Sequence, residues 1–109
     1  MKDYNSTVFK DVQPQQLAKA LTLITDLSLM RNFLADVMTT AEIKEISARL
    51  QAAKMLEVKQ KYTDIQAETG LSSATVARIS DWLKNGKSGY SATLNLIDAH
   101  SHIQPARAE

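Results

Sequence analysis

The stretch "TGLSSATVARI", residues 69–79, decides the fold because a single glycine joins two short helical patterns there. Gly70 suits a left-handed residue at the end of the first helix, and Ser72 can cap the second. The apolar positions that would pack the two helices together are Ile65, Leu71, Val76, Ile79 and Leu83. Two short helices joined by a glycine-containing turn are typical of a helix-turn-helix.

The outer face of the second helix is small and polar near its N-terminus. Its residues there are Ser72, Ser73, Ala74 and Thr75, and Arg78 follows one turn later. A thin helix end can enter the major groove of DNA, where hydroxyl and methyl groups contact base edges and an arginine binds guanine or phosphate. The pattern favours DNA reading. The alternative is a plain helical hairpin in which the serines only cap the helix and Arg78 is solvated.

Amphipathic segments precede this motif. Pro14 suits the first turn of a helix. A first apolar stripe at helical spacing consists of Leu17, Leu21, Ile24 and Leu27. A break near Asp26 separates it from a shorter stripe of Met30, Phe33, Leu34 and Val37. These stripes predict two helices, and the first is too apolar for an isolated surface helix.

Thr39 and Glu42 have the spacing of a capping box before the longest predicted helix, which runs to about Lys59. Its apolar positions are Ile43, Ile46, Leu50, Ala53 and Leu56. Thr63 and Gln66 repeat the capping-box spacing at the start of the helix-turn-helix. Asn85 and Gly86 end the recognition helix, and Ser88 or Gly89 opens a last helix with Tyr90, Leu94 and Ile97.

Composition agrees with an all-α fold. The 109 residues are 44% hydrophobic and 6% aromatic, with three glycines and two prolines, so a mostly aliphatic core and long helices are expected. We expect residues 1–12 to form a flexible arm and residues 13–103 a single helical domain, with its helix-turn-helix at about 62–84. Residues 104–109 are expected to be a disordered tail.

Several classes of protein are disfavoured. Without cysteine, neither a disulfide nor a thiolate metal site can form, and no apolar run approaches a membrane span. A cytoplasmic protein without a signal peptide is expected. His100 and His102 lie two residues apart, a spacing that favours a solvated tail over a metal site. No catalytic arrangement is visible, so we expect no enzyme and no cofactor. The net charge of +1 argues neither for nor against nucleic acid.

The run "MTTAEIKEISARLQAAKMLEVKQKYTDIQAETGLSSATVARISDWLKNG", residues 38–86, resembles the Trp repressor superfamily. It is most similar to small bacterial Trp-repressor-related proteins, and the similarity covers roughly residues 14–100. The resemblance implies about six helices and an intertwined homodimer. Its two recognition helices would face successive major grooves of a pseudo-palindromic DNA site.

Carried over by position, the DNA-contacting face of the family falls on Tyr62, Thr63, Gln66, Ser73, Ala74, Thr75, Ala77, Arg78 and Lys84. Lys61, Lys84 and Lys87 are expected to meet phosphates. Thr63 and Gln66 replace basic side chains of the family, so weaker and less salt-dependent binding is expected. Lys61 also stands where the family usually has a capping hydroxyl.

The resemblance also implies a ligand pocket, which here is vestigial. Thr39, Arg49 and Arg78 match the residues that bind tryptophan in the Trp repressor, but Ile79 and Trp82 replace a glycine and a serine. Their bulk should fill the space of the indole, so no tryptophan binding is expected. Arg49 alternatively forms an ion pair or caps a helix, and Trp82 is either plain core or holds the recognition helix in place.

The sequence therefore predicts a homodimeric, sequence-specific DNA-binding transcriptional regulator, a repressor by family resemblance, whose effector is open. The alternative is a dimeric interaction module whose helix-turn-helix binds protein. The weak net charge and the neutral residues Thr63 and Gln66 favour that alternative.

Overall fold

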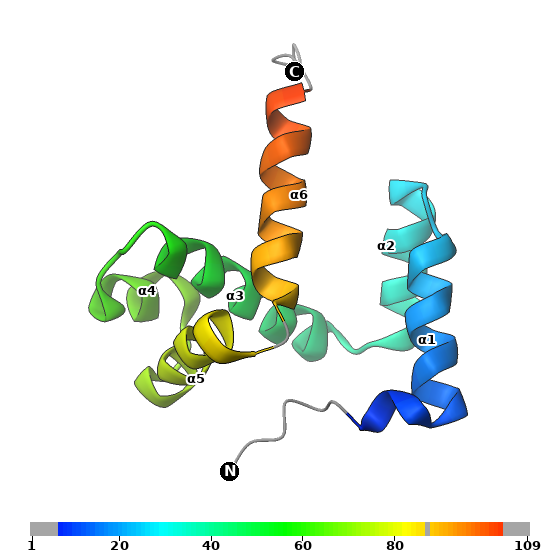
Figure 1. Cartoon of the computed structure of the whole chain (residues 1–109), viewed down its shortest axis with the longest axis horizontal. Helices are drawn as coiled ribbons and strands as arrows, with labels where there is room; N and C mark the ends of the chain where they lie inside the picture. The colour runs from blue at the N-terminus through cyan, green and yellow to red at the C-terminus, as the bar shows by residue number, and fades with distance from the viewer. Residues whose placement is uncertain (1–6, 87, 104–109) are drawn as a thin grey trace. The chain divides into compact units, whose positions relative to one another are not determined.

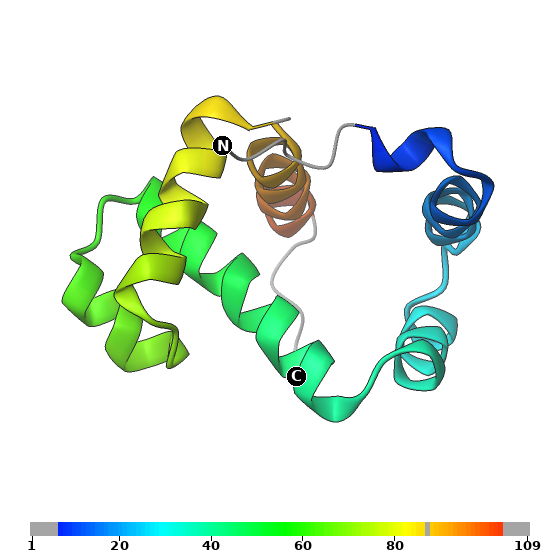
Figure 2. The same ribbon diagram turned by 90° about the horizontal axis from the view of Figure 1, so that it is seen from below.

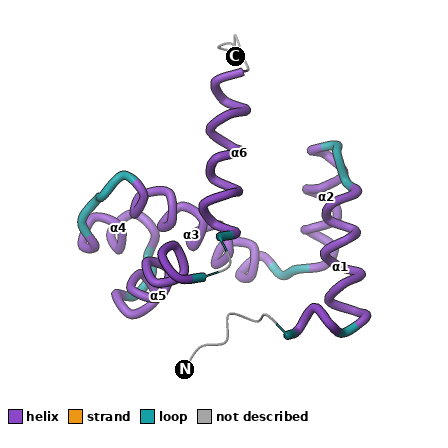
Figure 3. Tube along the Cα trace, in the orientation of Figure 1, coloured by secondary structure: helices purple, strands orange, loops and turns teal. Residues whose placement is uncertain are grey.

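The computed structural model describes residues 7–86 and 88–103, without the side chains of 101–103, and all regular structure in these ranges is helical (Figures 1 and 3). A short 3-10 helix precedes six α-helices. The elements are η1 (Val8–Lys10), α1 (Val12–Leu23), α2 (Leu27–Val37), α3 (Thr40–Glu57), α4 (Tyr62–Thr69), α5 (Ser73–Asn85) and α6 (Gly89–Ile103). The predicted all-α class with six helices is confirmed.

The chain divides into two compact units, Met1–Ile46 and Ser47–Glu109, with the division inside α3. The sequence had indicated one domain over residues 13–103. Helical structure begins at Val8, within the segment expected to be an arm, while residues 1–6 and the expected tail 104–109 lie outside the described residues. We describe each unit by itself.

In the first unit, α1 and α2 are separated at the break that the sequence predicted near Asp26. Helix α1 ends at Leu23, and Ile24 is extended, with φ −79° and ψ 118°. Asp26 then caps α2, because its Oδ2 accepts a hydrogen bond of 2.8 Å from the Leu29 amide. The apolar spacing carries across the break, whereas the cap residue fixes where the new helix starts.

Neither α1 nor α2 contains a buried residue. The large apolar side chains that they expose are Val12, Leu17, Leu23, Leu27, Leu29 and Val37. Leu23 is 74% exposed and Leu27 67%. These two helices therefore lack a core of their own within the chain.

The long helix α3 starts at the predicted capping box. The Glu42 amide donates to Thr39 Oγ1 over 3.1 Å, and the Thr39 amide donates to Glu42 Oε1 over 2.8 Å. Two amides of the first turn are thereby satisfied reciprocally, which confirms the box.

The second unit contains every buried residue of the described chain. They are Ala52, Ala53 and Met55 of α3, Ile65 of α4, Leu71 of the turn, Val76 and Ile79 of α5, and Leu94 of α6. Ala52 and Ala53 present little bulk, so neighbouring helices can approach α3 closely. Figures 1 and 2 show α4 and α5 beside the C-terminal half of α3, against which the helix-turn-helix packs. Among the described residues, no helix has the length and apolarity that crossing a membrane requires.

Candidate nucleic-acid interface

The turn between α4 and α5 is built around Gly70. Its φ of 75° is left-handed, and its amide donates to the Gln66 carbonyl over 2.8 Å. A Cβ at this position would meet nothing within 4 Å, so the backbone conformation rather than space favours glycine. Thr69 Oγ1 donates to the Ile65 carbonyl over 2.7 Å and accepts from the Leu71 amide over 3.2 Å. These bonds fix the turn that the sequence predicted.

Helix α5 starts at the predicted cap. Ser72 is extended, with φ −73° and ψ 159°, and its Oγ accepts from the Thr75 amide over 3.1 Å. The helix ends after Asn85, where the Gly86 amide donates to the Trp82 carbonyl over 2.9 Å. Both predicted ends of the recognition helix are confirmed.

Helix α4 starts differently from the prediction. The capping box expected at Thr63 and Gln66 is wrong, because the helix begins at Tyr62 and Lys61 occupies the N-cap without a side-chain hydrogen bond. Thr63 is therefore the second residue of the helix, too far along to cap it. Thr63 is exposed in the first turn of α4.

Sequence reasoning also missed Lys59, in the loop before α4. Lys59 is left-handed with φ 66°, a conformation that usually falls to glycine or asparagine. Its amide donates to the Leu56 carbonyl over 3.0 Å, and the Gln60 amide reaches back to the Met55 carbonyl over 3.1 Å. These two bonds close the end of α3 as a Schellman motif.

The two sides of α5 differ in burial as expected. Val76 and Ile79 are fully buried. The predicted contact residues on the outer side are exposed, namely Ser72, Ser73, Ala74, Ala77, Arg78 and Lys84, while Thr75 is half-buried. Lys87 lies outside the described residues. The end of α5 that would enter a groove therefore presents small side chains.

Hydroxyl groups link three residues along this face, each three positions from the next. Ser72 Oγ donates to Thr75 Oγ1 over 3.1 Å, and Arg78 Nη2 donates to the same oxygen over 3.4 Å. Residues three apart on a helix are neighbours, so the spacing alone permits this line. All three residues were predicted from the sequence, but the hydrogen bonds between them were not.

Charges around the motif are mixed. Lys61, Tyr62 and Thr63 of the predicted contact set are exposed at the start of α4, and Gln66 is half-buried. The cations of this region in the described chain are Lys59, Lys61, Arg78 and Lys84, and the anions are Asp64, Glu68 and Asp81. Gln51 Nε2 donates to Glu68 Oε2 over 3.4 Å, which ties α4 to α3.

Asp81 is the residue of the outer face that sequence reasoning missed. It is exposed three positions after Arg78, and Asn85 Nδ2 donates to its Oδ1 over 2.8 Å. A carboxylate here opposes phosphate but can accept from the amino group of cytosine. Its spacing from Ala77 and Arg78 was the signal that places it on this face.

The residues of the predicted ligand pocket have different surroundings. Ile79 is fully buried, and Trp82 is half-buried and packs against the core cluster. Arg78 is exposed and bonded to Thr75. Thr39 belongs to the first unit, where it caps α3. In the second unit, Ile79 and Trp82 therefore serve as packing residues.

Arg49 is half-buried on α3 and lies near Tyr90 at the start of α6. Burial raises the pKa of the Tyr90 phenol above its ordinary value of 10.0, and the positive charge of Arg49 partly offsets this rise. The cation therefore acts on a residue of the core rim. The roles of Arg49 as a ligand anchor, an ion-pair partner or a helix cap stay predictions.

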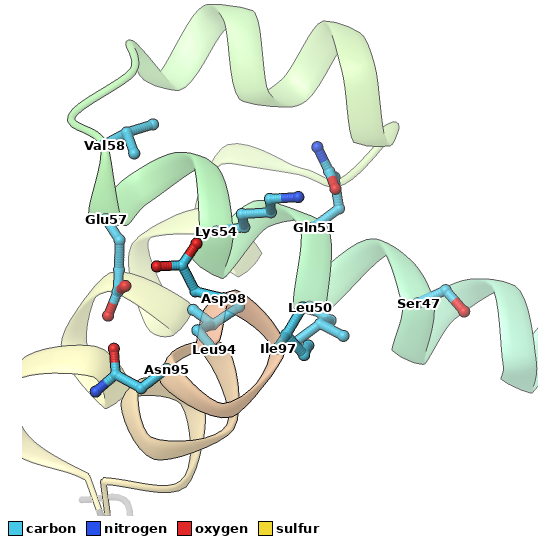
Figure 4. Close-up of a pocket in the computed structure, with 10 residues that line it drawn as sticks. All are labelled: Ser47, Leu50, Gln51, Lys54, Glu57, Val58, Leu94, Asn95, Ile97 and Asp98. Atoms are coloured by element: carbon cyan, nitrogen blue, oxygen red, sulfur yellow. The ribbon is translucent and has the colours of Figure 1, made fainter. Parts of the chain in front are cut away.

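A separate hollow of about 440 Å³ lies between α3 and α6 (Figure 4). It is lined by Ser47, Leu50, Gln51, Lys54, Glu57, Val58, Leu94, Asn95, Ile97 and Asp98. Its apolar part consists of Leu50, Val58, Leu94 and Ile97, and charged side chains of α3 and α6 line the rest. None of the five predicted pocket residues lines it.

The geometry defines a helix-turn-helix protein whose second helix has a packed inner side and small, exposed side chains at its N-terminal end. A family model described as Trp repressor protein matches residues 13–97. The chain belongs to the Trp repressor family.

Individual relatives agree with this assignment. YerC of Bacillus subtilis (strain 168), which is described as uncharacterized, is 33% identical over 82 residues, covering 75% of this chain and 79% of YerC. The crystal structure of a TrpR like protein from Eubacterium eligens ATCC 27750 has a TM-score of 0.79 at 33% identity and covers 85% of this chain and 96% of that chain. A crystal structure from Staphylococcus aureus has a TM-score of 0.72 at 31% identity, over 77% and 84% of the two chains.

Proposed function

We propose that this protein is a sequence-specific DNA-binding transcriptional regulator that acts as a homodimer. The observation that carries the proposal is the exposed N-terminal half of α5, where Ser73, Ala74 and Ala77 are small and Arg78 is the one long side chain of its predicted contact set. A helix of this shape fits the major groove, and its arginine can bind guanine. Family membership supports the same class of regulator.

Within this proposal the predicted contacts divide by chemistry. Lys61, Lys84 and Lys87 neutralise phosphates, which fixes register without reading sequence. Tyr62, Thr63 and Gln66 add uncharged contacts from α4. The remaining contacts come from α5, and they read base edges or position the side chains that do, namely Ser72, Ser73, Ala74, Thr75, Ala77 and Arg78. Three phosphate contacts per protomer imply a salt dependence with a logarithmic slope of about −5 for the dimer.

The apolar side chains of the first unit support the proposed homodimer. Leu17, Leu23, Leu27 and Leu29 are all exposed in the single chain. Large exposed apolar side chains that gather on one surface are typical of an interaction site, and a second copy would cover these four. A two-fold dimer would present two copies of α5 to a pseudo-palindromic site.

We further propose that tryptophan does not control this protein. Ile79 has no exposed surface, and Trp82 packs against the same core cluster, so an indole would have to displace core side chains. Opening a packed core costs several kcal/mol, about as much as a weak ligand supplies. Stoichiometric, micromolar binding of tryptophan in calorimetry would contradict this statement.

The test of the main proposal is selection of bound duplexes from a random pool at low salt. The wild type should enrich a two-fold symmetric motif, and Arg78→Ala should lose the preference at one base pair in each half-site, typically worth about 1–3 kcal/mol. Arg31→Ala, which removes an exposed arginine of α2, is the matched control and should enrich the wild-type motif. If the wild type enriches no motif, the regulator proposal fails.

A protein partner is the second candidate for the same surface. The mixed charges favour it, because Asp64, Glu68 and Asp81 interrupt the basic residues of α4 and α5. Under this alternative, Arg78→Ala and Asp81→Ala would both weaken a protein complex. For DNA, removal of Asp81 should strengthen binding by removing repulsion of phosphate.

A further inference from the structure

The line of hydroxyls on α5 gives Arg78 a neighbour that determines where its guanidinium points. Arg78 is exposed, and a long exposed side chain samples many rotamers and loses that freedom when it binds. Here its Nη2 donates to Thr75 Oγ1, which draws the guanidinium toward the N-terminal half of the helix. That half carries the small residues Ser73 and Ala74.

Thr75 is itself held in place. Its amide donates to Ser72 Oγ over 3.1 Å, and its Oγ1 accepts from the Ser72 hydroxyl over 3.1 Å. Thr75 is half-buried, and its β-branched side chain has few rotamers. The helix cap therefore fixes the oxygen to which Arg78 is bound.

We propose that Thr75 is a positioning residue for Arg78: through Oγ1 it orients the guanidinium for a guanine, so base preference at that position depends on Thr75 acting through Arg78. This inference rests on the DNA-reading function proposed above. A guanidinium that is oriented before binding loses less entropy when it binds two acceptors of guanine in a fixed plane. The distance of 3.4 Å is long for a hydrogen bond, so a modest effect is expected.

The experiment is a double-mutant cycle between Thr75→Val and Arg78→Ala, with affinity measured on the duplex that the wild type selects. Valine keeps the branched shape of threonine and removes only the hydroxyl. Thr75→Val should weaken binding by about three- to fivefold when Arg78 is present and should have almost no effect when it is absent. Thr75→Ser, which retains the hydroxyl, should keep the wild-type base preference.

Ser73→Ala is the matched control because it removes a neighbouring exposed hydroxyl outside the line Ser72–Thr75–Arg78. In the double variant, the fold-losses of affinity caused by Ser73→Ala and by Arg78→Ala should simply multiply. For each variant, the affinity for the selected duplex is divided by the affinity for a random duplex. Partial unfolding lowers both affinities alike, so the ratio reports only the loss of positioning. If Thr75→Val weakens binding equally in both backgrounds, the positioning role is overturned, while the regulator function stands.

A second measurement needs no DNA. Nuclear magnetic resonance of the Arg78 side-chain nitrogen should show less motion in the wild type than in Thr75→Val, and no difference for Ser73→Ala. Unchanged motion in Thr75→Val overturns the inference. Reduced motion together with a failure of the wild type to enrich any duplex would instead reject the proposed function and retain the link between the two side chains.

Discussion

Helices α1 and α2 differ from α4 and α5 in where their apolar side chains lie. The first pair contains no buried residue, although it carries Leu17, Leu23 and Leu27. The second pair fully buries Ile65, Val76 and Ile79. Short helices gain most of their stability from packing of the apolar face, so α4 and α5 are explained within one chain. Helices α1 and α2 are not explained in this way, and the proposed homodimer would cover them with a second copy.

The strongest test compares one core residue of the second unit with one exposed residue of the first. Ile65→Ala should lower the free energy of unfolding by about 2–5 kcal/mol, because it leaves a cavity between α3 and the helix-turn-helix. Leu23→Ala, at a concentration where the protein is monomeric, should cost less than about 0.5 kcal/mol, since Leu23 is 74% exposed. Urea unfolding followed by circular dichroism measures both, and equal losses would contradict the comparison.

The next test asks whether a second copy covers α1. Leu17→Glu combined with Leu23→Glu should break the dimer, because two carboxylates would be buried in an apolar contact. Loss of the linked second half-site should weaken DNA binding by about 100-fold, or roughly 3 kcal/mol. Sedimentation measures the dimer, and fluorescence anisotropy measures the affinity.

The matched control for that pair is Gln13→Glu combined with Gln16→Glu, which adds the same charge to exposed polar positions of α1. It should remain dimeric. If the leucine variant also stays dimeric at micromolar concentration, the contact between copies does not involve this face of α1.

A smaller effect separates Gly70, which follows the end of α4, from Gly89, which begins α6. Gly70→Ala should cost about 1–2 kcal/mol, because φ is 75° there and alanine is strained in that region. Gly89→Ala should be neutral or slightly stabilising, since a Cβ there meets nothing within 4 Å and alanine favours helix. Thermal unfolding of the two variants measures the difference, and an equal response would show that the turn at Gly70 does not require a left-handed residue.

Local chemistry explains why most helix ends could be predicted from the sequence. Asp26, Thr39 and Ser72 cap helices through bonds to amides three residues away, and such bonds depend only on spacing. The start of α4 was predicted wrongly because Lys61 offers no capping oxygen, so the spacing of Thr63 and Gln66 was the stronger local signal. The left-handed conformation of Lys59 was not predicted because backbone hydrogen bonds fix the end of α3, and these require no particular residue type.

The candidate site was predicted as a set of positions but not as an arrangement. Helical periodicity places Ala74, Ala77 and Arg78 outside and Val76 and Ile79 inside, and the burial agrees. Periodicity does not show which rotamer a side chain adopts, so the hydrogen bond between Arg78 and Thr75 could not be predicted from the sequence. The division of the chain within α3 also needed them, because a continuous helix gives no break in its sequence pattern.

The smallest expected effect is the pH dependence of stability that comes from Tyr90. Its pKa is raised in the folded state, first by burial, so the unfolded chain loses the phenolic proton at a lower pH than the folded chain. The contribution of Tyr90 to the free energy of unfolding is fully present below pH 10.0 and is lost as the pH rises through the pKa of Tyr90 in the folded state. Because Tyr90 is only half-buried, the loss should stay below about 1 kcal/mol.

Tyr90→Phe should remove this alkaline loss, whereas Tyr62→Phe, at an exposed tyrosine of α4, should leave it unchanged. Arg49→Gln should raise the pKa of Tyr90 further, because the cation of Arg49 lowers it. Phenolate absorbance gives the pKa, and urea unfolding at several pH values gives the stability. If Arg49→Gln leaves the Tyr90 titration unmoved, Arg49 does not act on the rim of this core, and its alternative role as a ligand anchor regains support.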